Sequence, residues 1–154
     1  MRFELVDRID ELKKGSYAIG VKCISLADDV FEHHFPSHPV YPGSLLIESM
    51  AQLGGALLEL SLRDTLTFCP RCVLSMVKAK FREMVKPGDA LQLRADVLSI
   101  HEQAAQVRCV GTCNAAPRCE AELTYVILHI DDPALQASRD RFLDVVTRQT
   151  RYVE

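Results

Sequence analysis

The sequence predicts an α+β domain in which one long helix is wrapped by an antiparallel sheet of about five or six strands. Two observations carry this prediction. Residues 44–62 repeat apolar side chains at helical spacing, whereas the segments around them alternate apolar and polar residues with the period of a strand. The chain has 154 residues, of which 48% are hydrophobic and 25% charged, and this is enough to bury one core. We therefore expect a single domain.

The elements up to residue 62 are predicted from their periodicity. Residues 15–26 are rich in strand formers and favour an antiparallel pair near the N-terminus. The helix is expected from Ser44 to about Leu62, with one stripe of leucine and methionine and a second stripe of Glu48, Gln52, Gly55 and Glu59. Its length and hydropathy would suit a membrane span, but the carboxylates interrupt it. We therefore expect a buried central helix.

The second half of the chain returns to strand periodicity. Val77, Ala79 and Phe81 alternate with Lys78, Lys80 and Arg82, and Pro87–Asp89 turns the chain into a further alternating segment. Two more strands are expected near 105–113 and 119–130. The sequence Asp131-Asp132-Pro133 breaks the last of them, and the apolar residues that follow it predict a short amphipathic helix: Leu135, Phe142 and Val146.

Charge and cysteine content limit the classes of partner. A net charge of −3 gives no global attraction to nucleic acid or to an anionic membrane. The N-terminal residues contain no apolar signal, so we expect a cytoplasmic protein. The six cysteines are expected to be reduced there, with Cys109 and Cys113 buried on one strand face. A zinc site made by Cys69 and Cys72 with three histidines of the segment 33–38 is the alternative, but the spacing gives it little support, and we expect no metal and no cofactor.

The segment from residue 31 to residue 52 carries the candidate chemistry. Pro36, Pro39 and Pro42 fix the backbone, so the loop should be stiff. Pro42-Gly43 ends the loop just where the helix begins, where the first N–H groups lack partners, and the missing side chain of Gly43 leaves room for a substrate oxygen. Glu48 lies one turn further, among apolar neighbours that favour a protonated carboxyl. His34 can act as a base near neutral pH.

This segment resembles the 3-hydroxyacyl-[acyl-carrier-protein] dehydratases, which have the hot-dog fold. The family pattern is matched by His34-Phe35-Pro36, Pro39, Pro42-Gly43, Glu48 and Ala51-Gln52. Residues 5–8 are similar to the family's first strand, and 79–89 to a later strand that ends in Pro-Gly-Asp. The resemblance covers about residues 3–130, so we expect a hot-dog domain over 1–130 and a C-terminal extension, packed on it, over 131–154.

The resemblance implies a role for each matched residue. His34 would take the α-proton of a (3R)-3-hydroxyacyl thioester, Glu48 would protonate the departing hydroxyl, and the Gly43 N–H would polarise the thioester carbonyl. The product would be the trans-2-enoyl thioester of fatty acid or related polyketide or polyene synthesis. Gln52, Phe35 and Pro42 would support the site, together with His33, which stands where the family has glycine.

The resemblance also implies partners. The substrate would be carried by the 4′-phosphopantetheine of an acyl-carrier protein, for which the exposed row Lys78, Lys80 and Arg82, extended by Arg71 and Lys86, is a candidate docking patch. The assembly would be a homodimer or a trimer of dimers, with His34 and Glu48 from different subunits. Two other functions remain open, because the fold also hosts acyl thioesterases and could serve as a non-catalytic acyl-carrier-binding or scaffold protein.

Overall fold

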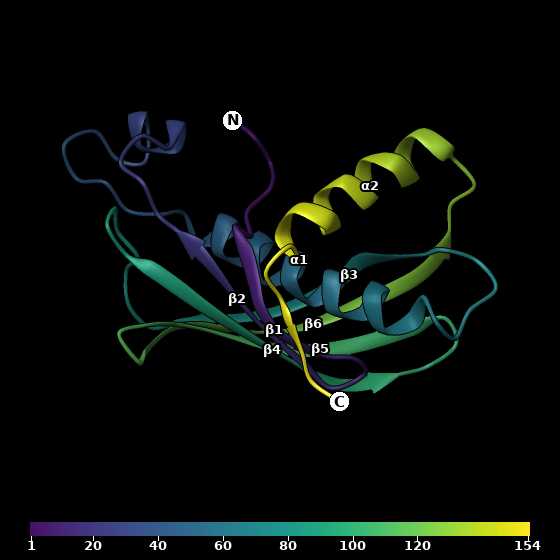
Figure 1. Ribbon diagram of the computed structural model, residues 1–154. Coiled ribbons are helices and arrows are strands. Elements are labelled where there is room, and N and C mark those ends of the chain that lie inside the picture. The colour runs from purple at the N-terminus through teal and green to yellow at the C-terminus, as the bar shows by residue number, and fades with distance from the viewer.

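One long helix lies against a curved antiparallel sheet, and a second helix lies on the same side of that sheet (Figure 1). The computed structural model describes residues 1–154. Its first half comprises β1 (Arg8–Lys13), β2 (Tyr17–Cys23), the 3-10 turn η1 (Asp29–Glu32) and α1 (Gly43–Leu62). Its second half comprises β3 (Pro70–Phe81), β4 (Ala90–Ile100), β5 (Ala104–Cys113), β6 (Ala116–His129), α2 (Pro133–Val146) and β7 (Arg151–Tyr152). The α+β hot-dog prediction is confirmed.

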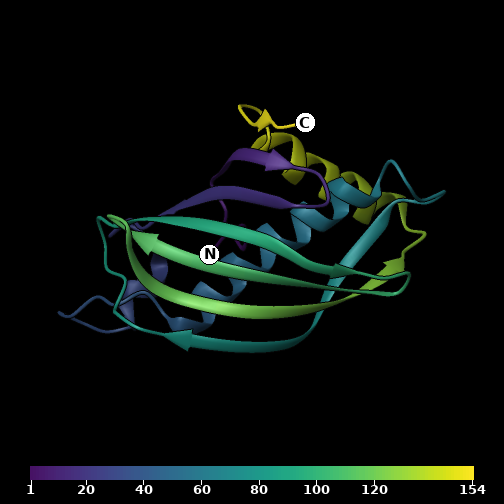
Figure 2. The same cartoon turned by 90° about the horizontal axis from the view of Figure 1, so that it is seen from below.

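The strands form one sheet in the order β3-β6-β5-β4-β2-β1-β7. Every pair is antiparallel except β1 and β7, which are parallel. The seventh strand goes beyond the five or six that the sequence predicts, because β7 has only two residues and shows no alternation. Figure 2 shows the four strands β3 to β6 side by side, in front of α1 in this view. Strand β3 is therefore a free edge of the sheet.

The core lies between α1 and the concave face of the sheet. The predicted apolar stripe of α1 is buried there, with Met50, Leu53 and Leu57 fully inaccessible. Sheet residues such as Leu93, Val107 and Leu123 meet them with no exposed surface. The helix is long and apolar enough for a membrane span, but 67% of its most apolar window is buried inside the protein.

Two sequence expectations differ from the structure in detail. The family resemblance places the first strand at residues 5–8, but β1 begins at Arg8. The preceding residues run across α1 instead, because the backbone N–H of Leu5 donates to the side chain of Gln52 at 2.7 Å. In the C-terminal helix, Phe142 and Val146 are buried as the pattern indicates, whereas Leu135 is 55% exposed.

Candidate active site

The loop that carries His34 is closed by two hydrogen bonds within itself. The N–H of Val40 donates to the carbonyl of His34 at 3.1 Å, and His34 Nδ1 lies 2.7 Å from the carbonyl oxygen of Val40. The next residue, Tyr41, donates its N–H to Val85 at 2.8 Å and so anchors the loop to the chain after β3. The prolines restrict the backbone between these contacts. The imidazole is therefore held in one place.

The contact with Val40 decides the tautomer of His34. A carbonyl oxygen can only accept a hydrogen bond, so Nδ1 must carry the proton and donate it. In the neutral ring, Nε2 then has a free lone pair and can act as a base. The ring of Phe35 stacks on the imidazole with centroids 4.1 Å apart, while Phe35 itself remains 51% exposed. His33 is exposed beside them.

The N-terminus of α1 offers an unpaired donor. Pro42 is the N-cap residue and provides no side-chain acceptor, and no acceptor in the chain takes the N–H of Gly43. The expectation that the missing side chain leaves open room at Gly43 is corrected, because the ring of Phe81 fills that space. A β-carbon at Gly43 would lie 3.0 Å from Cζ of Phe81. Glycine is needed here for this close packing, since a β-carbon that near would push the ring away.

Glu48 is oriented by a hydrogen bond one helical turn away. Gln52 Nε2 donates to Glu48 Oε1 at 2.9 Å and to the carbonyl of Phe3 at 3.0 Å, while Gln52 Oε1 accepts from Leu5. The amide therefore links the N-terminal segment to the carboxyl of Glu48. Because Oε1 is occupied as an acceptor, Oε2 is the oxygen that is free to carry and donate a proton.

Glu48 lines a cleft of about 400 Å³ between α1, the ends of β3 and β6, and α2. Gln52 and Gly55 form its floor along α1, and Tyr125 closes one side with its hydroxyl donating to the carbonyl of Ala51 at 2.7 Å. Burial raises the pKa of Tyr125 well above its ordinary value, so this hydroxyl keeps its proton. His34 is not among the residues that line the cleft. Within one chain, the cleft thus contains the candidate acid without the candidate base.

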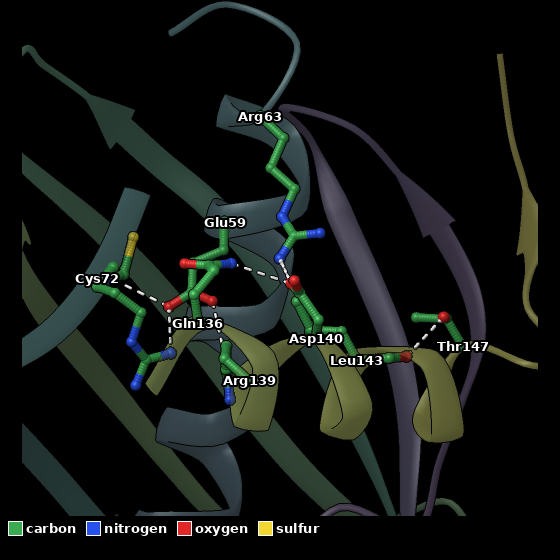
Figure 3. A network of polar contacts seen from close by, with 9 residues as sticks. Glu59, Arg63, Cys72, Gln136, Arg139, Asp140, Leu143 and Thr147 are labelled. Atoms are coloured by element: carbon green, nitrogen blue, oxygen red, sulfur yellow. Dashed lines mark hydrogen bonds and ion pairs between the residues drawn. The ribbon is translucent and has the colours of Figure 1, made fainter. Parts of the chain in front are cut away.

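At the far end of the cleft, charged residues pair in a way that the sequence did not predict. Glu59 is completely buried, and its carboxylate accepts from Arg71 Nη1 at 3.0 Å, from the backbone N–H of Cys72 at 3.0 Å and from Arg139 Nε at 2.7 Å (Figure 3). The available signal was the polar stripe 48–52–55–59 on a mostly apolar helix. That stripe indicates a polar lining, but it does not say which residues complete it.

The row of Lys78, Lys80 and Arg82 is exposed as predicted, but it is not a purely cationic patch. The register of β3 and β6 places Glu122 opposite Lys78 and Glu120 opposite Lys80. Arg82 Nη2 also lies 3.0 Å from Glu120 Oε1. Arg71 does not extend the row, because it is bound to Glu59 inside the cleft.

The cysteines form no disulfide in this structure. All six are free thiols; Cys109 and Cys113 are buried on the sheet as the pattern predicts, and Cys72 is buried while Cys69 is exposed. No three His, Cys, Asp or Glu side chains are grouped so that they could hold a metal ion. The structure therefore gives no support to the zinc alternative.

Comparison with known proteins gives consistent sequence relatives. Residues 1–122 match the model of the FabA-like domain. The chain is 39% identical over 125 residues to 3-hydroxyacyl-[acyl-carrier-protein] dehydratase FabZ of Clostridium acetobutylicum, with 80% of this chain and 86% of that protein aligned. It is 38% identical over 130 residues to the protein of the same name from a Sulfurovum species, with 82% and 87% aligned.

Solved structures with a similar fold are more distant in sequence. A hot-dog-like protein from Thermanaerovibrio acidaminovorans superposes with a TM-score of 0.63 at 17% identity, over 83% of this chain and 91% of that one. A hypothetical thioesterase from Streptococcus pneumoniae, solved with coenzyme A, gives a TM-score of 0.64 at 13% identity, over 81% and 88%. At such identities these likenesses concern the fold alone.

Proposed function

The chain belongs to the FabA-like family, and we propose that it dehydrates a 3-hydroxyacyl thioester at a site shared between two subunits, with His34 from one and Glu48 from the other. The family relatives establish the coarser activity, which is that of a 3-hydroxyacyl-[acyl-carrier-protein] dehydratase of fatty acid synthesis. The finer proposal rests on the positions of the candidate acid and the candidate base within one chain. The acid lines the cleft, whereas the base lies on a loop outside it.

Each group has one step in the proposed reaction. Nε2 of His34 removes the α-proton, and the electron pair moves toward the thioester carbonyl, whose oxygen accepts a hydrogen bond from the free N–H of Gly43. The C–O bond at the β-carbon then breaks, and Oε2 of Glu48 gives its proton to the departing hydroxyl, which leaves as water. The imidazolium and the carboxylate return to their starting states by exchanging protons with solvent.

A homodimer is supported by the free edge of the sheet. Strand β3 has no neighbour on its outer side and exposes Val73, Met76 and Phe81 by 42%, 67% and 49%. An exposed apolar edge is prone to pair with another strand, and pairing of two β3 edges about a two-fold axis would cover both. Phe35, on the His34 loop, is a further exposed apolar residue at 51%. Such a dimer could bring the loop of one subunit to the cleft of the other.

Complementation between inactive variants tests the shared site. Glu48→Gln keeps the size of the side chain but cannot supply the proton, and His34→Ala removes the base, so each variant should lose at least about a hundredfold in turnover. A mixed dimer has one site with both defects and one with neither. After joint denaturation and refolding, about half of the dimers are mixed, so about a quarter of wild-type activity should return.

Controls are needed to show that any activity that returns comes from mixed dimers and not from refolding itself. Hydration of a crotonyl-type thioester, followed by ultraviolet absorbance, measures activity, and native mass analysis confirms mixed dimers. Two different His34 variants refolded together should stay inactive, whereas His101→Ala, in an exposed turn, should behave as wild type. If confirmed mixed dimers of His34→Ala and Glu48→Gln stay inactive, the shared site is wrong. A wild-type protein without dehydratase activity would overturn the function itself.

The carrier-docking role of Lys78, Lys80 and Arg82 stays a prediction with its own test. Because Glu120 and Glu122 offset part of this charge, the effect should be moderate. Replacing Lys78 and Arg82 by Glu should raise KM for the carrier-bound substrate and leave KM for a pantetheine thioester unchanged. Equal changes for both substrates would contradict docking at this row. The cytoplasmic location and any assembly beyond the dimer also stay predictions.

A further inference from the structure

Helix α2 forms the far wall of the cleft that contains Glu48. It contributes Leu135, Ser138, Arg139 and Phe142 to the lining. The FabA-like model ends at residue 122, so the whole of α2 lies beyond it. Side chains rather than close backbone packing connect α2 to α1, through Arg139 with Glu59 and through Arg63 Nη2 with Asp140 Oδ1 at 2.6 Å. The cleft therefore ends in a wall that the family match does not describe.

Arg139 is the charged group of that wall, and two contacts hold its side chain in place. Its Nε donates to the buried carboxylate of Glu59, and the guanidinium lies over the ring of Phe142, with Cζ 4.8 Å from the ring centroid. Only 15% of its side-chain surface is exposed. Nη2 lies over the cleft floor, 3.8 Å from where a β-carbon of Gly55 would stand. The guanidinium is thus rigid, largely desolvated and directed along the cleft floor.

The far end of the cleft has more donors than acceptors. The two terminal nitrogens of Arg139 have no acceptor in the chain, since its only hydrogen bond is made by Nε. Arg71 is bound to the same carboxylate, so two guanidinium groups surround one carboxylate and leave a net positive charge. The two carboxylates that line the cleft, Glu4 and Glu48, belong to the end where Gln52 lies. Such an end suits an anionic oxygen group.

The distance along α1 between Glu48 and the Arg139 end of the cleft suits the length of an acyl chain. Glu48 and Gly55 are seven residues apart on α1, which is about 10 Å along the helix axis at ~1.5 Å per residue. A thioester whose β-carbon is at Glu48 would direct the rest of its acyl chain toward the guanidinium. A methyl end there would displace water from the N–H groups and leave them unpaired, whereas a carboxylate would pair with them.

We propose that Arg139 is a specificity-determining residue that selects 3-hydroxyacyl thioesters whose far end carries a carboxylate over those with a plain alkyl end. This inference rests on the proposed function, because it places the acyl chain in the cleft of Glu48. Glu59 is the positioning residue that holds the guanidinium, and α2 supplies the wall. The remaining cleft surface is partly apolar, which suits the methylene groups between the two polar ends.

The test compares matched substrates on the full-length protein. The probes are pantetheine thioesters of equal chain length that end in a methyl group, a methyl ester or a carboxylate, and kcat and KM are measured separately for each. The wild type should prefer the carboxylate by at least about tenfold in kcat/KM, mainly through KM, with the ester between. Arg139→Met should abolish this preference. Arg139→Lys should keep part of it, and Arg141→Met, on the exposed face of the same helix, should keep all of it.

Each outcome has a distinct meaning. If the wild type dehydrates the methyl and carboxylate substrates equally well, the inference is wrong and the proposed function stands. If it dehydrates none of them, the proposed function itself fails. If Arg139→Met lowers kcat for all three substrates by the same factor and leaves their KM ratio unchanged, Arg139 has only a structural role, and this too overturns the inference. If Arg139→Met fails to fold, Arg139→Lys decides the assignment because it keeps the charge that pairs with Glu59, and an unchanged carboxylate preference in that variant overturns the inference.

Discussion

Neutralising Glu59 should destabilise the protein far more than neutralising a surface carboxylate. Glu59→Gln keeps the size of the side chain and one carbonyl oxygen, so Arg71 and the N–H of Cys72 can still find an acceptor. The new amide N–H₂ would face Nε of Arg139, which is also a donor. Two guanidinium groups would then lie in the cleft without a counter-charge.

The burial of each partner determines how much folding free energy Glu59→Gln should lose. Glu59 and Arg139 have side-chain exposures of 1% and 15%, and removing one partner of such a pair costs about 3–5 kcal/mol. Arg71 is 30% exposed and can regain water, which favours the lower end of that range, about 3 kcal/mol. For a chain of this length, each kcal/mol lowers the melting temperature by about 2–4 °C. We expect a drop of about 6–12 °C.

Chemical and thermal unfolding at one fixed protein concentration measure this effect, because dimerisation would make the apparent stability depend on concentration. Asp96→Asn is the matched control. Asp96 pairs with Arg94 at 2.9 Å, but both side chains are about half exposed, so its loss should cost less than about 1 kcal/mol. Hydrogen exchange should also accelerate in α2, since Glu59 holds Arg139. Equal losses in the two variants would refute the reasoning from burial.

Three further predictions follow from local packing and exposure. Gly54→Ala would place a β-carbon 2.5 Å from the hydroxyl of Tyr125 and should cost about 1–3 kcal/mol in unfolding, whereas Gly55→Ala, whose nearest contact would be 3.7 Å, should be neutral or stabilising. His33→Gly should remain active within about threefold across several acyl chain lengths, because His33 is exposed and holds nothing else in place. At pH 8 an aromatic disulfide reagent should modify the two exposed thiols, Cys23 and Cys69, in the folded protein, and the four buried thiols only after unfolding. Burial raises the pKa of Cys72 to about 12 and of Cys119 to about 11, so these thiols stay protonated and do not react.

The long helix was predictable because its burial and its periodicity have the same cause. Met50, Leu53 and Leu57 recur at helical spacing since one face of α1 packs on the sheet, and the helix begins one residue before the predicted Ser44. The loop with Pro36, Pro39 and Pro42 could also be predicted, because proline restricts the backbone locally. Local rules of this kind need no knowledge of the rest of the chain.

The contacts that complete the cleft were not predictable in this way. Glu59 is visible as a polar residue in an apolar helix, but its partners Arg71 and Arg139 are 12 and 80 residues away in the sequence. Phe81 belongs to the strand pattern, yet nothing local indicates that its ring covers Gly43. Such pairs depend on how the sheet curves around the helix, and hydrophobic periodicity does not specify that curvature.

In the proposed dimer, the free edge of β3 would form the subunit interface and would also contact the start of α1, where the reaction takes place. The strand that would pair across the two-fold axis ends at Phe81, and the ring of Phe81 packs against Gly43, where α1 begins. A shift of strand β3 at this edge would therefore move the ring of Phe81 and, with it, the N–H of Gly43 that would polarise the thioester. Glu48 lies on the same helix, one turn further on, so both groups would be positioned by the same contact. If the site is shared, the monomer lacks the base at its own cleft, and activity should disappear with dissociation rather than with unfolding.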